Sequence, residues 1–81
     1  MTVKVYSTTT CPYCVMTKEY LKSKGVKFED ILLEFNPQAA QEMVELTGQM
    51  GVPVTLVVKD DGQKSAIIGF DRVGLDKVLG L

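Results

Sequence analysis

Two cysteines separated by two residues are the part of this 81-residue sequence best suited to chemistry. They lie in the run Cys11-Pro12-Tyr13-Cys14. A thiolate is the nucleophile in disulfide exchange, and a second thiol nearby can attack the mixed disulfide that forms. The spacing therefore predicts a dithiol redox site, in which Cys14 is close enough to attack a sulfur bonded to Cys11.

The surrounding residues place this pair where a strand passes into a helix. Val3–Ser7 alternates as a strand does, and a helix is expected from Pro12 to about Lys24. Free N–H groups and the positive end of the dipole at a helix start stabilise an anion, so Cys11 is expected to be a thiolate. Such positions lower a thiol pKa from about 8.5 into the range of about 3.5–7.5. Cys14 is expected to be more buried.

Other uses of a cysteine pair are less well supported. A structural zinc ion needs four ligands, whereas the chain has two cysteines and no histidine, so only a dimer could complete the site. An inert buried pair is the second alternative. The missing histidine also excludes Cys–His and Ser–His catalysis. We therefore expect redox chemistry, with no metal and no resident cofactor.

The rest of the chain predicts an α/β domain over residues 1–81. The further elements are a strand at Lys27–Leu33, a helix opened by Asn36-Pro37 and ended by Gly48, strands at Val54–Val58 and Lys64–Ile68 joined by a tight turn at Asp61-Gly62, and a helix capped by Asp71. The order is βαβαββα, with a parallel first unit and helices on both faces of four strands. The inward-facing residues are expected to be Cys14, Thr17 and Leu21 in the first helix, Ala40, Met43, Val44 and Thr47 in the second, and Leu75, Val78 and Leu79 in the third.

Composition narrows the partners and the compartment. Hydrophobic residues make up 46% of the chain and the formal net charge is −1, which favours neither nucleic acid nor an acidic membrane as partner. The N-terminal residues lack the apolar run of a signal peptide, and no stretch has the length of a membrane span. We expect a cytoplasmic protein.

Two short motifs after the cysteines remain ambiguous from their residues alone. Pro53 either opens a strand with a trans peptide bond, or forms a cis bond that leaves the Val52 backbone free to pair with an extended substrate. The turn Gly69-Phe70-Asp71 either caps the last helix or offers backbone N–H groups to a carboxylate.

Together these pieces resemble the glutaredoxin family over essentially the whole chain. The matching segments are Val3–Ser7, Cys11-Pro12-Tyr13-Cys14, Val52-Pro53 and Gly69-Phe70-Asp71. The resemblance implies the thioredoxin fold: a four-stranded mixed sheet of order 2-1-3-4 flanked by three helices, with the last two strands antiparallel to the first pair. It also implies a cis Pro53 lying against Cys11.

The resemblance further implies roles for individual residues. Cys11 would be the nucleophile and Cys14 the resolving thiol of a thiol–disulfide oxidoreductase. Pro12, Tyr13 and Pro53 would shape the active-site loop. The residues expected to contact glutathione or another substrate are Thr10, Tyr13, Val52, Pro53, Gly69, Phe70 and Asp71. The Val52 backbone would pair with the cysteinyl part, and Phe70 and Asp71 would receive the γ-glutamyl end.

Four positions differ from the family pattern. Thr8 replaces a common basic residue, Gly51 a common threonine and Phe70 a cysteine, and Arg72 follows Asp71 where a polar or acidic residue is frequent. These differences predict weaker glutathione binding.

Several partners therefore remain open. The Gly-Phe turn resembles redoxins that are reduced by thioredoxin reductase, so glutathione and that reductase are both possible donors. Clients of the family include ribonucleotide reductase and methionine sulfoxide reductase. The alternative functions are an iron–sulfur cluster held by Cys11 between two chains, and a non-catalytic interaction domain.

Overall fold

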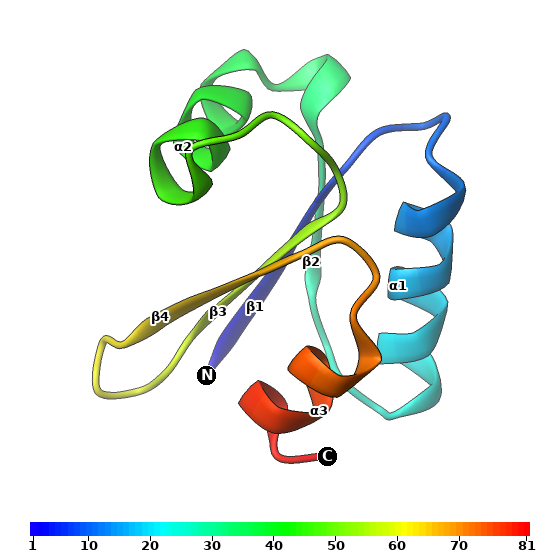
Figure 1. Ribbon diagram of the computed structural model, residues 1–81, viewed down its shortest axis with the longest axis vertical. Helices are drawn as coiled ribbons and strands as arrows, with labels where there is room; N and C mark the ends of the chain where they lie inside the picture. Colours follow the sequence, from blue (N-terminus) through cyan, green and yellow to red (C-terminus); the bar gives the residue numbers. More distant parts are fainter.

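The computed structural model describes residues 1–81 and contains one sheet with helices on both of its faces (Figure 1). In chain order the elements are β1 (Thr2–Ser7), α1 (Pro12–Ser23), β2 (Glu29–Leu32), the short 3-10 helix η1 (Leu33–Phe35), α2 (Pro37–Thr47), β3 (Val54–Val58), β4 (Lys64–Ile68) and α3 (Arg72–Leu79). The predicted order βαβαββα is confirmed, with η1 as an addition. No helix is long and apolar enough to cross a membrane.

The strand order is β2-β1-β3-β4, as the resemblance implied. β1 pairs with β2 in parallel and with β3 in antiparallel fashion. The expectation that the last two strands are both antiparallel to the first pair is wrong for β4. Because β4 pairs antiparallel with β3, and β3 is antiparallel to β1, β4 runs in the same direction as β1. The reversal follows from the hairpin at Asp60–Gly62, which is closed by a hydrogen bond from the Gly62 N–H to the Lys59 carbonyl at 2.9 Å.

Alternation along the strands divides the core into two layers. The layer beneath α1 and α3 contains Val3, Val5, Leu21, Val57, Ile67 and Leu75. The layer beneath α2 contains Tyr6, Ala39, Met43, Val54 and Leu56. Odd-numbered residues of β1 and β3 thus face α1 and α3, whereas even-numbered residues face α2 (Figure 1).

The inward face predicted for α1 is confirmed, since Cys14, Thr17 and Leu21 are its buried residues. In α3 Leu75 is buried as predicted, whereas Val78 and Leu79 are half-buried and pack against the core layer beneath α1 and α3. In α2 the buried residues are Ala39 and Met43, whereas Ala40, Val44 and Thr47 are only half-buried. Since Ala39 and Met43 are four residues apart, the line of closest packing lies one residue earlier than predicted.

The second strand is shorter than the predicted Lys27–Leu33. β1 pairs with β2 only from Lys4 opposite Glu29 to Ser7 opposite Leu32, because β1 itself ends at Ser7. Beyond that point the chain turns into η1, which begins at Leu33. An edge strand has a single partner, so β2 ends where β1 ends; its start at Glu29 lies opposite Lys4, inside β1, and is not set by the partner's end.

Candidate active site

The sulfur of Cys11 forms the N-cap of α1. Its backbone is extended (φ −109°, ψ 105°), and its Sγ accepts the N–H of Cys14 at 3.1 Å. Pro12 occupies the first turn, where its missing N–H leaves no donor unsatisfied. The first turn contains no acidic residue, so no carboxylate competes for the free N–H groups. A sulfur thus takes the place that a Ser or Asp side chain occupies in other helices.

The two cysteines form a disulfide whose Cα atoms are 5.2 Å apart. Cys11 is half-buried, whereas Cys14 has no solvent exposure. Tyr13 between them is 62% exposed, and Thr10 before them is exposed as well. A molecule in solvent therefore reaches the sulfur of Cys11 and not that of Cys14.

The peptide bond between Val52 and Pro53 is cis, as the resemblance implied. The carbonyl oxygen of Val52 lies 3.9 Å from the Cys11 sulfur, whereas its N–H has no hydrogen-bond partner within the protein. Pro53 is buried, and its carbonyl accepts the N–H of Gly69 at 2.8 Å. The loop before β3 is thus bonded to the loop after β4, and its Val52-Pro53 step lies beside Cys11.

The turn Gly69-Phe70-Asp71 caps α3. The Asp71 side chain accepts the N–H of Gly74 at 3.0 Å, so the capping prediction is confirmed. The backbone N–H groups of Phe70 and Asp71 donate to no other group of the protein. The Phe70 ring packs edge-to-face against Tyr20 of α1, with ring centroids 6.1 Å apart. This turn is therefore attached both to the loop before β3 and to α1.

Two hydrogen bonds between Thr9, two residues before Cys11, and Glu34 were not predicted from the sequence. We call this pair the Thr9–Glu34 clamp. Glu34, in η1, accepts the Thr9 backbone N–H at 2.5 Å and the Thr9 hydroxyl at 2.6 Å. Both bonds favour the ionised carboxylate, and they lower the pKa of Glu34, the side-chain bond most. The residues are 25 positions apart, so only the parallel pairing of β1 and β2 brings them together.

Two basic side chains, one on α1 and one on α3, are paired with other groups. The Lys18 ammonium lies 3.1 Å from the Asp30 carboxylate, and the Arg72 guanidinium lies 5.1 Å from the centre of the Tyr20 ring. The Tyr20 hydroxyl donates to Asp76, and this bond is the main reason that the pKa of Tyr20 is raised. Both cations are thus engaged by other side chains.

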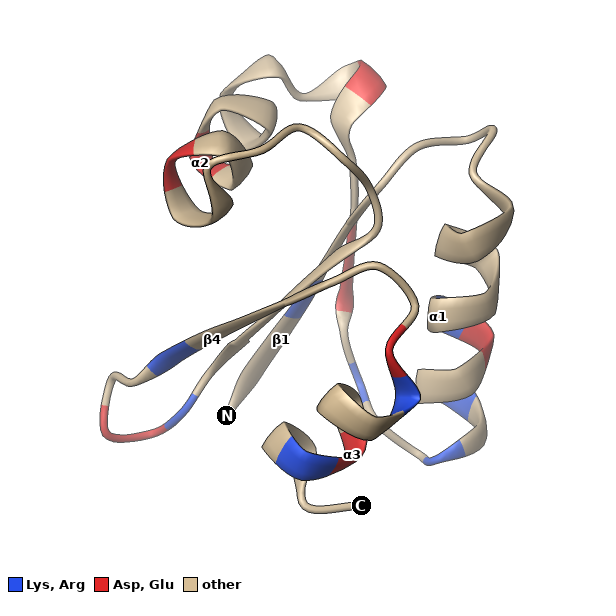
Figure 2. Ribbon diagram, viewed as in Figure 1, with Lys and Arg blue, Asp and Glu red and all other residues tan.

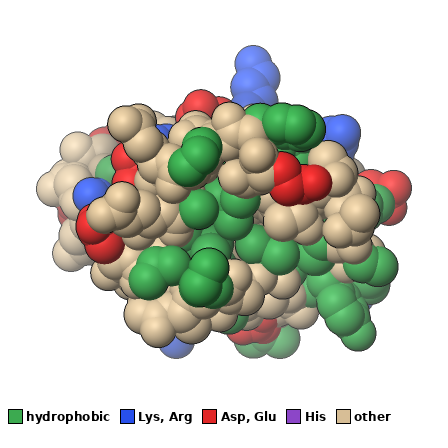
Figure 3. Space-filling view, turned by 90° about the horizontal axis from the view of Figure 1, so that it is seen from above, with side chains coloured by type: hydrophobic (Ala, Val, Ile, Leu, Met, Phe, Trp, Pro, Cys, Tyr) green, Lys and Arg blue, Asp and Glu red, His purple; other side chains and the backbone are tan.

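The three segments that meet around Cys11 are uncharged. Ser7–Thr17, Leu46–Val58 and Ser65–Phe70 contain no Lys, Arg, Asp or Glu. Figure 2 shows the loops before α1 and before β3 without charged residues. Figure 3, viewed from this end, shows hydrophobic side chains across the middle of the face and Lys and Arg only at its margins. Exposed apolar residues in these segments include Tyr13, Val15, Met16 and Met50.

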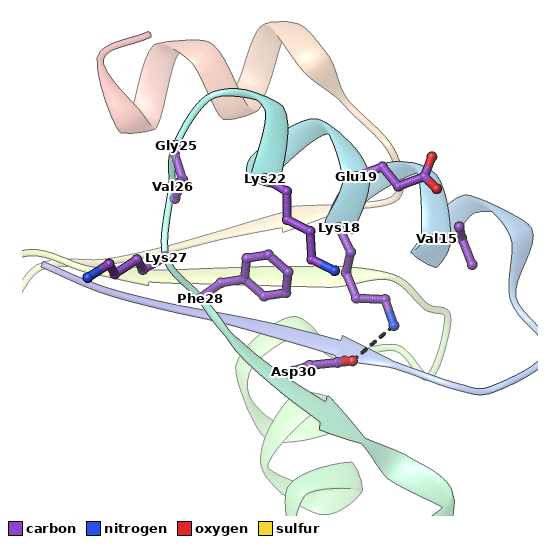
Figure 4. A pocket seen from close by; sticks show the side chains of 9 residues that line it. All are labelled: Val15, Lys18, Glu19, Lys22, Gly25, Val26, Lys27, Phe28 and Asp30. Atoms are coloured by element: carbon purple, nitrogen blue, oxygen red, sulfur yellow. Dashed lines mark hydrogen bonds and ion pairs between the residues drawn. The ribbon is translucent and has the colours of Figure 1, made fainter.

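A hollow of the surface lies along α1. It is an open groove of about 880 Å³ between α1 and residues 25–30, with Phe28 at its floor and Lys18 and Lys22 extending over it (Figure 4). Val15 lines its nearer end, whereas neither cysteine lines it. No group of three or more His, Cys, Asp or Glu side chains is placed to hold a metal ion.

Comparisons with known proteins agree with this geometry. The glutaredoxin family model matches residues 3–61. A glutaredoxin-like 8.6 kDa protein in the rubredoxin operon of Clostridium pasteurianum is 43% identical over 77 residues, covering 95% of this chain and 96% of that protein. Glutaredoxin 3 of Escherichia coli is 34% identical over 79 residues, covering 95% of each chain.

A solved structure is similar over nearly the same length. The glutaredoxin of Archaeoglobus fulgidus superposes with a TM-score of 0.79 at 30% identity, covering 95% of this chain and 84% of that one. The family match, the relatives and the shared fold lead to one conclusion. The chain belongs to the glutaredoxin family of thiol–disulfide oxidoreductases.

Proposed function

We propose that this chain reduces disulfides of client proteins, and mixed disulfides between proteins and glutathione, with Cys11 as nucleophile and Cys14 as resolving thiol. The observation that carries the proposal is the place of the Cys11 sulfur. It caps α1, accepts an N–H at 3.1 Å and is the more exposed sulfur of the pair. A thiolate there gains from the helix dipole and from a direct hydrogen bond.

In the first step the Cys11 thiolate attacks one sulfur of the client disulfide. A bond forms between Cys11 and that sulfur, the client disulfide breaks, and the second client sulfur leaves as a thiolate that takes up a proton. In the second step Cys14 attacks Cys11 and releases the client. The Cα separation of 5.2 Å already allows this bond. With a glutathione mixed disulfide, a second glutathione can take the place of Cys14.

The backbone beside Cys11 is suited to hold an extended substrate. The Val52 N–H is unpaired within the protein and lies next to the cis Pro53. A strand-like segment can pair with such a group in the manner of an added β-strand. Thr10 and Tyr13, one residue before and two residues after Cys11 in the sequence, are exposed and accessible to the same substrate.

Glutathione as co-substrate is supported by the start of α3. The backbone N–H groups of Phe70 and Asp71 are free, and two N–H groups at a helix start suit a carboxylate such as that of the γ-glutamyl end. Gly69 joins this turn to Pro53, so one molecule of glutathione could extend from Val52 to Asp71.

A thioredoxin reductase as electron donor is supported by a different observation. The dithiol is surrounded by uncharged segments, and Lys18 and Arg72 are both engaged elsewhere. Glutathione has two carboxylates, whereas a protein partner can bury apolar surface against this face. Either donor belongs in a compartment that keeps thiols reduced, such as the cytoplasm.

The nucleophile and the resolving thiol can be separated by two variants. We expect Cys11→Ser to lose activity on both kinds of substrate. We expect Cys14→Ser to keep activity on a glutathionylated peptide and to lose it on a protein disulfide. Activity of Cys11→Ser near the wild-type level would contradict the assignment.

The donor can be identified by a direct comparison. The oxidised protein is supplied either with glutathione, glutathione reductase and NADPH, or with thioredoxin reductase and NADPH, and NADPH consumption is measured. A rate only in the first mixture supports glutathione as donor, whereas a rate only in the second supports the reductase.

A further inference from the structure

Positive charge is concentrated in one segment of this otherwise acidic chain. Residues 18–27 contain four lysines and one acidic residue, whereas the rest of the chain has five basic and nine acidic residues. This segment forms the second half of α1 and the loop that leads to β2. Figure 2 shows its basic residues near the end of α1 and in that loop. The same segment supplies most of the lining of the groove along α1.

The groove has an apolar floor between two walls. The wall formed by α1 contains residues spaced three or four apart, which therefore lie on one face of the helix: Val15, Lys18, Glu19 and Lys22. The facing wall is formed by residues 25–28 and by Asp30. Phe28 lies between the walls, is half-buried and packs against the core layer beneath α1 and α3 (Figure 4). An apolar side chain from another molecule can contact the exposed part of its ring.

The charged groups of the groove leave two ammonium groups without an ion pair. Lys18 is paired with Asp30 at 3.1 Å. The Glu19 side chain points away from Phe28 (Figure 4). Lys22 extends over Phe28, Lys27 lies on its other side, and neither forms an ion pair. Two free cations thus border an apolar floor.

The groove begins where the uncharged face around Cys11 ends. Val15 is 47% exposed and belongs both to that face and to the lining of the groove. Along the helix axis Lys22 lies about 16 Å from Cys11, since each residue of a helix adds about 1.5 Å. An extended chain covers about 3.3 Å per residue, so about five residues span this distance. A segment joined to Cys11 by a disulfide is therefore long enough to reach the groove.

We propose that the groove along α1 binds an acidic segment of the client protein. The segment has carboxylates on either side of an aromatic or aliphatic side chain, and lies about five residues from the client's reactive cysteine. The apolar side chain contacts Phe28, and the carboxylates pair with Lys22 and Lys27. This inference rests on the proposed function, because it concerns the clients whose disulfides Cys11 attacks.

Charge and shape together select this occupant. The free ammonium groups of Lys22 and Lys27 favour carboxylates, and complementary charge across an interface raises the rate of encounter and fixes the register of the partner. The exposed part of Phe28 favours a segment that also has an apolar side chain to bury. The groove therefore discriminates among clients by residues outside their disulfide.

The experiment uses the reduced protein and synthetic peptides that contain one cysteine in a mixed disulfide with thionitrobenzoate. Attack of Cys11 on the peptide sulfur forms a disulfide between them and releases coloured thionitrobenzoate, whose absorbance gives the rate. A spacer of about four glycine and serine residues joins the cysteine to a tail. The tails are Glu-Phe-Glu, Gln-Phe-Gln and Lys-Phe-Lys, each placed either before or after the cysteine. Rates are measured against peptide concentration at low salt.

Two variants with equal changes in net charge separate the groove from the charge of the whole protein. The first is Lys22→Glu combined with Lys27→Glu. The second, Lys59→Glu combined with Lys64→Glu, changes two lysines at the hairpin between β3 and β4, which do not line the groove. The neutral Gln-Phe-Gln peptide is the control for folding and for the dithiol. Its rate should stay within about twofold of wild type in both variants.

In wild type we expect the Glu-Phe-Glu peptide, in one of its two orientations, to react about fivefold more efficiently than the Gln-Phe-Gln peptide. In the groove variant this preference should disappear and pass to the Lys-Phe-Lys peptide. In the hairpin variant it should remain. Equal rates for the three tails in wild type would overturn the inference and leave Cys11 as nucleophile intact. A preference for the acidic tail that survives in the groove variant, or is lost equally in the hairpin variant, would also overturn it. Absence of release from every peptide would refute the proposed function together with this inference.

Discussion

The starts of α1 and α3 share one geometry and differ in chemistry. Cys11 and Asp71 both have extended backbones, at φ −109°, ψ 105° and φ −121°, ψ 92°. Each side chain accepts the N–H of the residue three positions later, at 3.1 Å for the sulfur and 3.0 Å for the carboxylate. The difference lies in that later residue, which is Cys14 in α1 and Gly74 in α3.

The comparison shows why this cysteine spacing makes a dithiol. In a capping box, the side chain at the third helical position reaches back to the capping residue. At α1 both side chains end in sulfur, so the two sulfurs meet. At α3 even a Cβ at position 74 would lie 2.6 Å from the Asp71 carboxylate, and glycine leaves the cap undisturbed. An ordinary capping geometry is thus sufficient to bring two thiols together.

The largest effect is expected when Cys11, which caps α1, is replaced by aspartate, the residue type that caps α3. Cys11→Asp keeps a good capping group, so the reduced protein should remain folded with little loss of stability. Disulfide reduction should fall on the order of a thousandfold or more, because the nucleophile is gone. The measurements are reduction of a glutathionylated peptide and urea unfolding of the reduced protein. An unfolded variant would show that Cys11 does more for the helix than cap it.

The next effect concerns stability at α3. Asp71→Ala removes the cap and should lower the free energy of unfolding by about 1 kcal/mol. Asp71→Asn is the matched control, since an amide oxygen can still accept the Gly74 N–H. Urea unfolding of both variants checks this. Equal losses in the two would mean that the charge of Asp71, and not its capping bond, stabilises α3.

A smaller effect is expected from Gly74→Ala, and its sign depends on the cap. Alanine is the better helix residue by roughly 0.5–1 kcal/mol, but its Cβ would displace the Asp71 carboxylate. In wild type the two effects should nearly cancel, to within about 0.5 kcal/mol. In Asp71→Ala the same substitution should stabilise by about 0.5–1 kcal/mol. A double-mutant cycle measures the coupling, and additive effects would contradict the crowding argument.

Local patterns predicted both helix starts correctly, because a cap is a local interaction. Each start is indicated by a few consecutive residues. In α1 these are the extended capping residue and the Pro12 that follows it, and in α3 they are the turn and the Asp71 that ends it. The C-terminal limit of β2 was less predictable, since an edge strand ends where its partner ends. In α2 the buried residue is Ala39 and not the predicted Ala40. Which residues of this helix are buried depends on the sheet residues that they contact, such as Tyr6, and these are distant in the sequence.

The contacts that hold the site together were not predictable from local patterns. The Val52 carbonyl near Cys11 joins residues 41 positions apart, and Tyr20 and Asp76 are separated by 56. Neither pair has a sequence signature of its own. The cis Pro53 was reached only through the family resemblance, because most X-Pro bonds are trans. The Thr9–Glu34 clamp belongs to the same class of long-range contacts.

The smallest expected effect tests that clamp, which has no counterpart at α3. Glu34→Gln keeps one oxygen acceptor and removes the charge that strengthens both bonds from Thr9. The variant should therefore be slightly less stable than wild type at neutral pH. Glu19→Gln is the matched control, because Glu19 is an exposed residue of α1 without a hydrogen bond.

The pH dependence gives this prediction its sign. The fold lowers the pKa of Glu34 from its ordinary value of 4.5, so the folded chain holds the carboxylate more strongly ionised than the unfolded chain does. The stabilisation is therefore complete above pH 4.5 and is lost as the pH falls through the lowered pKa. Urea unfolding is measured at neutral and acid pH. The difference in free energy of unfolding between wild type and Glu34→Gln should disappear on acidification, whereas Glu19→Gln should not differ from wild type at either pH. If Glu34→Gln remains less stable than wild type in acid, the hydrogen bonds from Thr9 depend on the shape of the side chain and not on its charge.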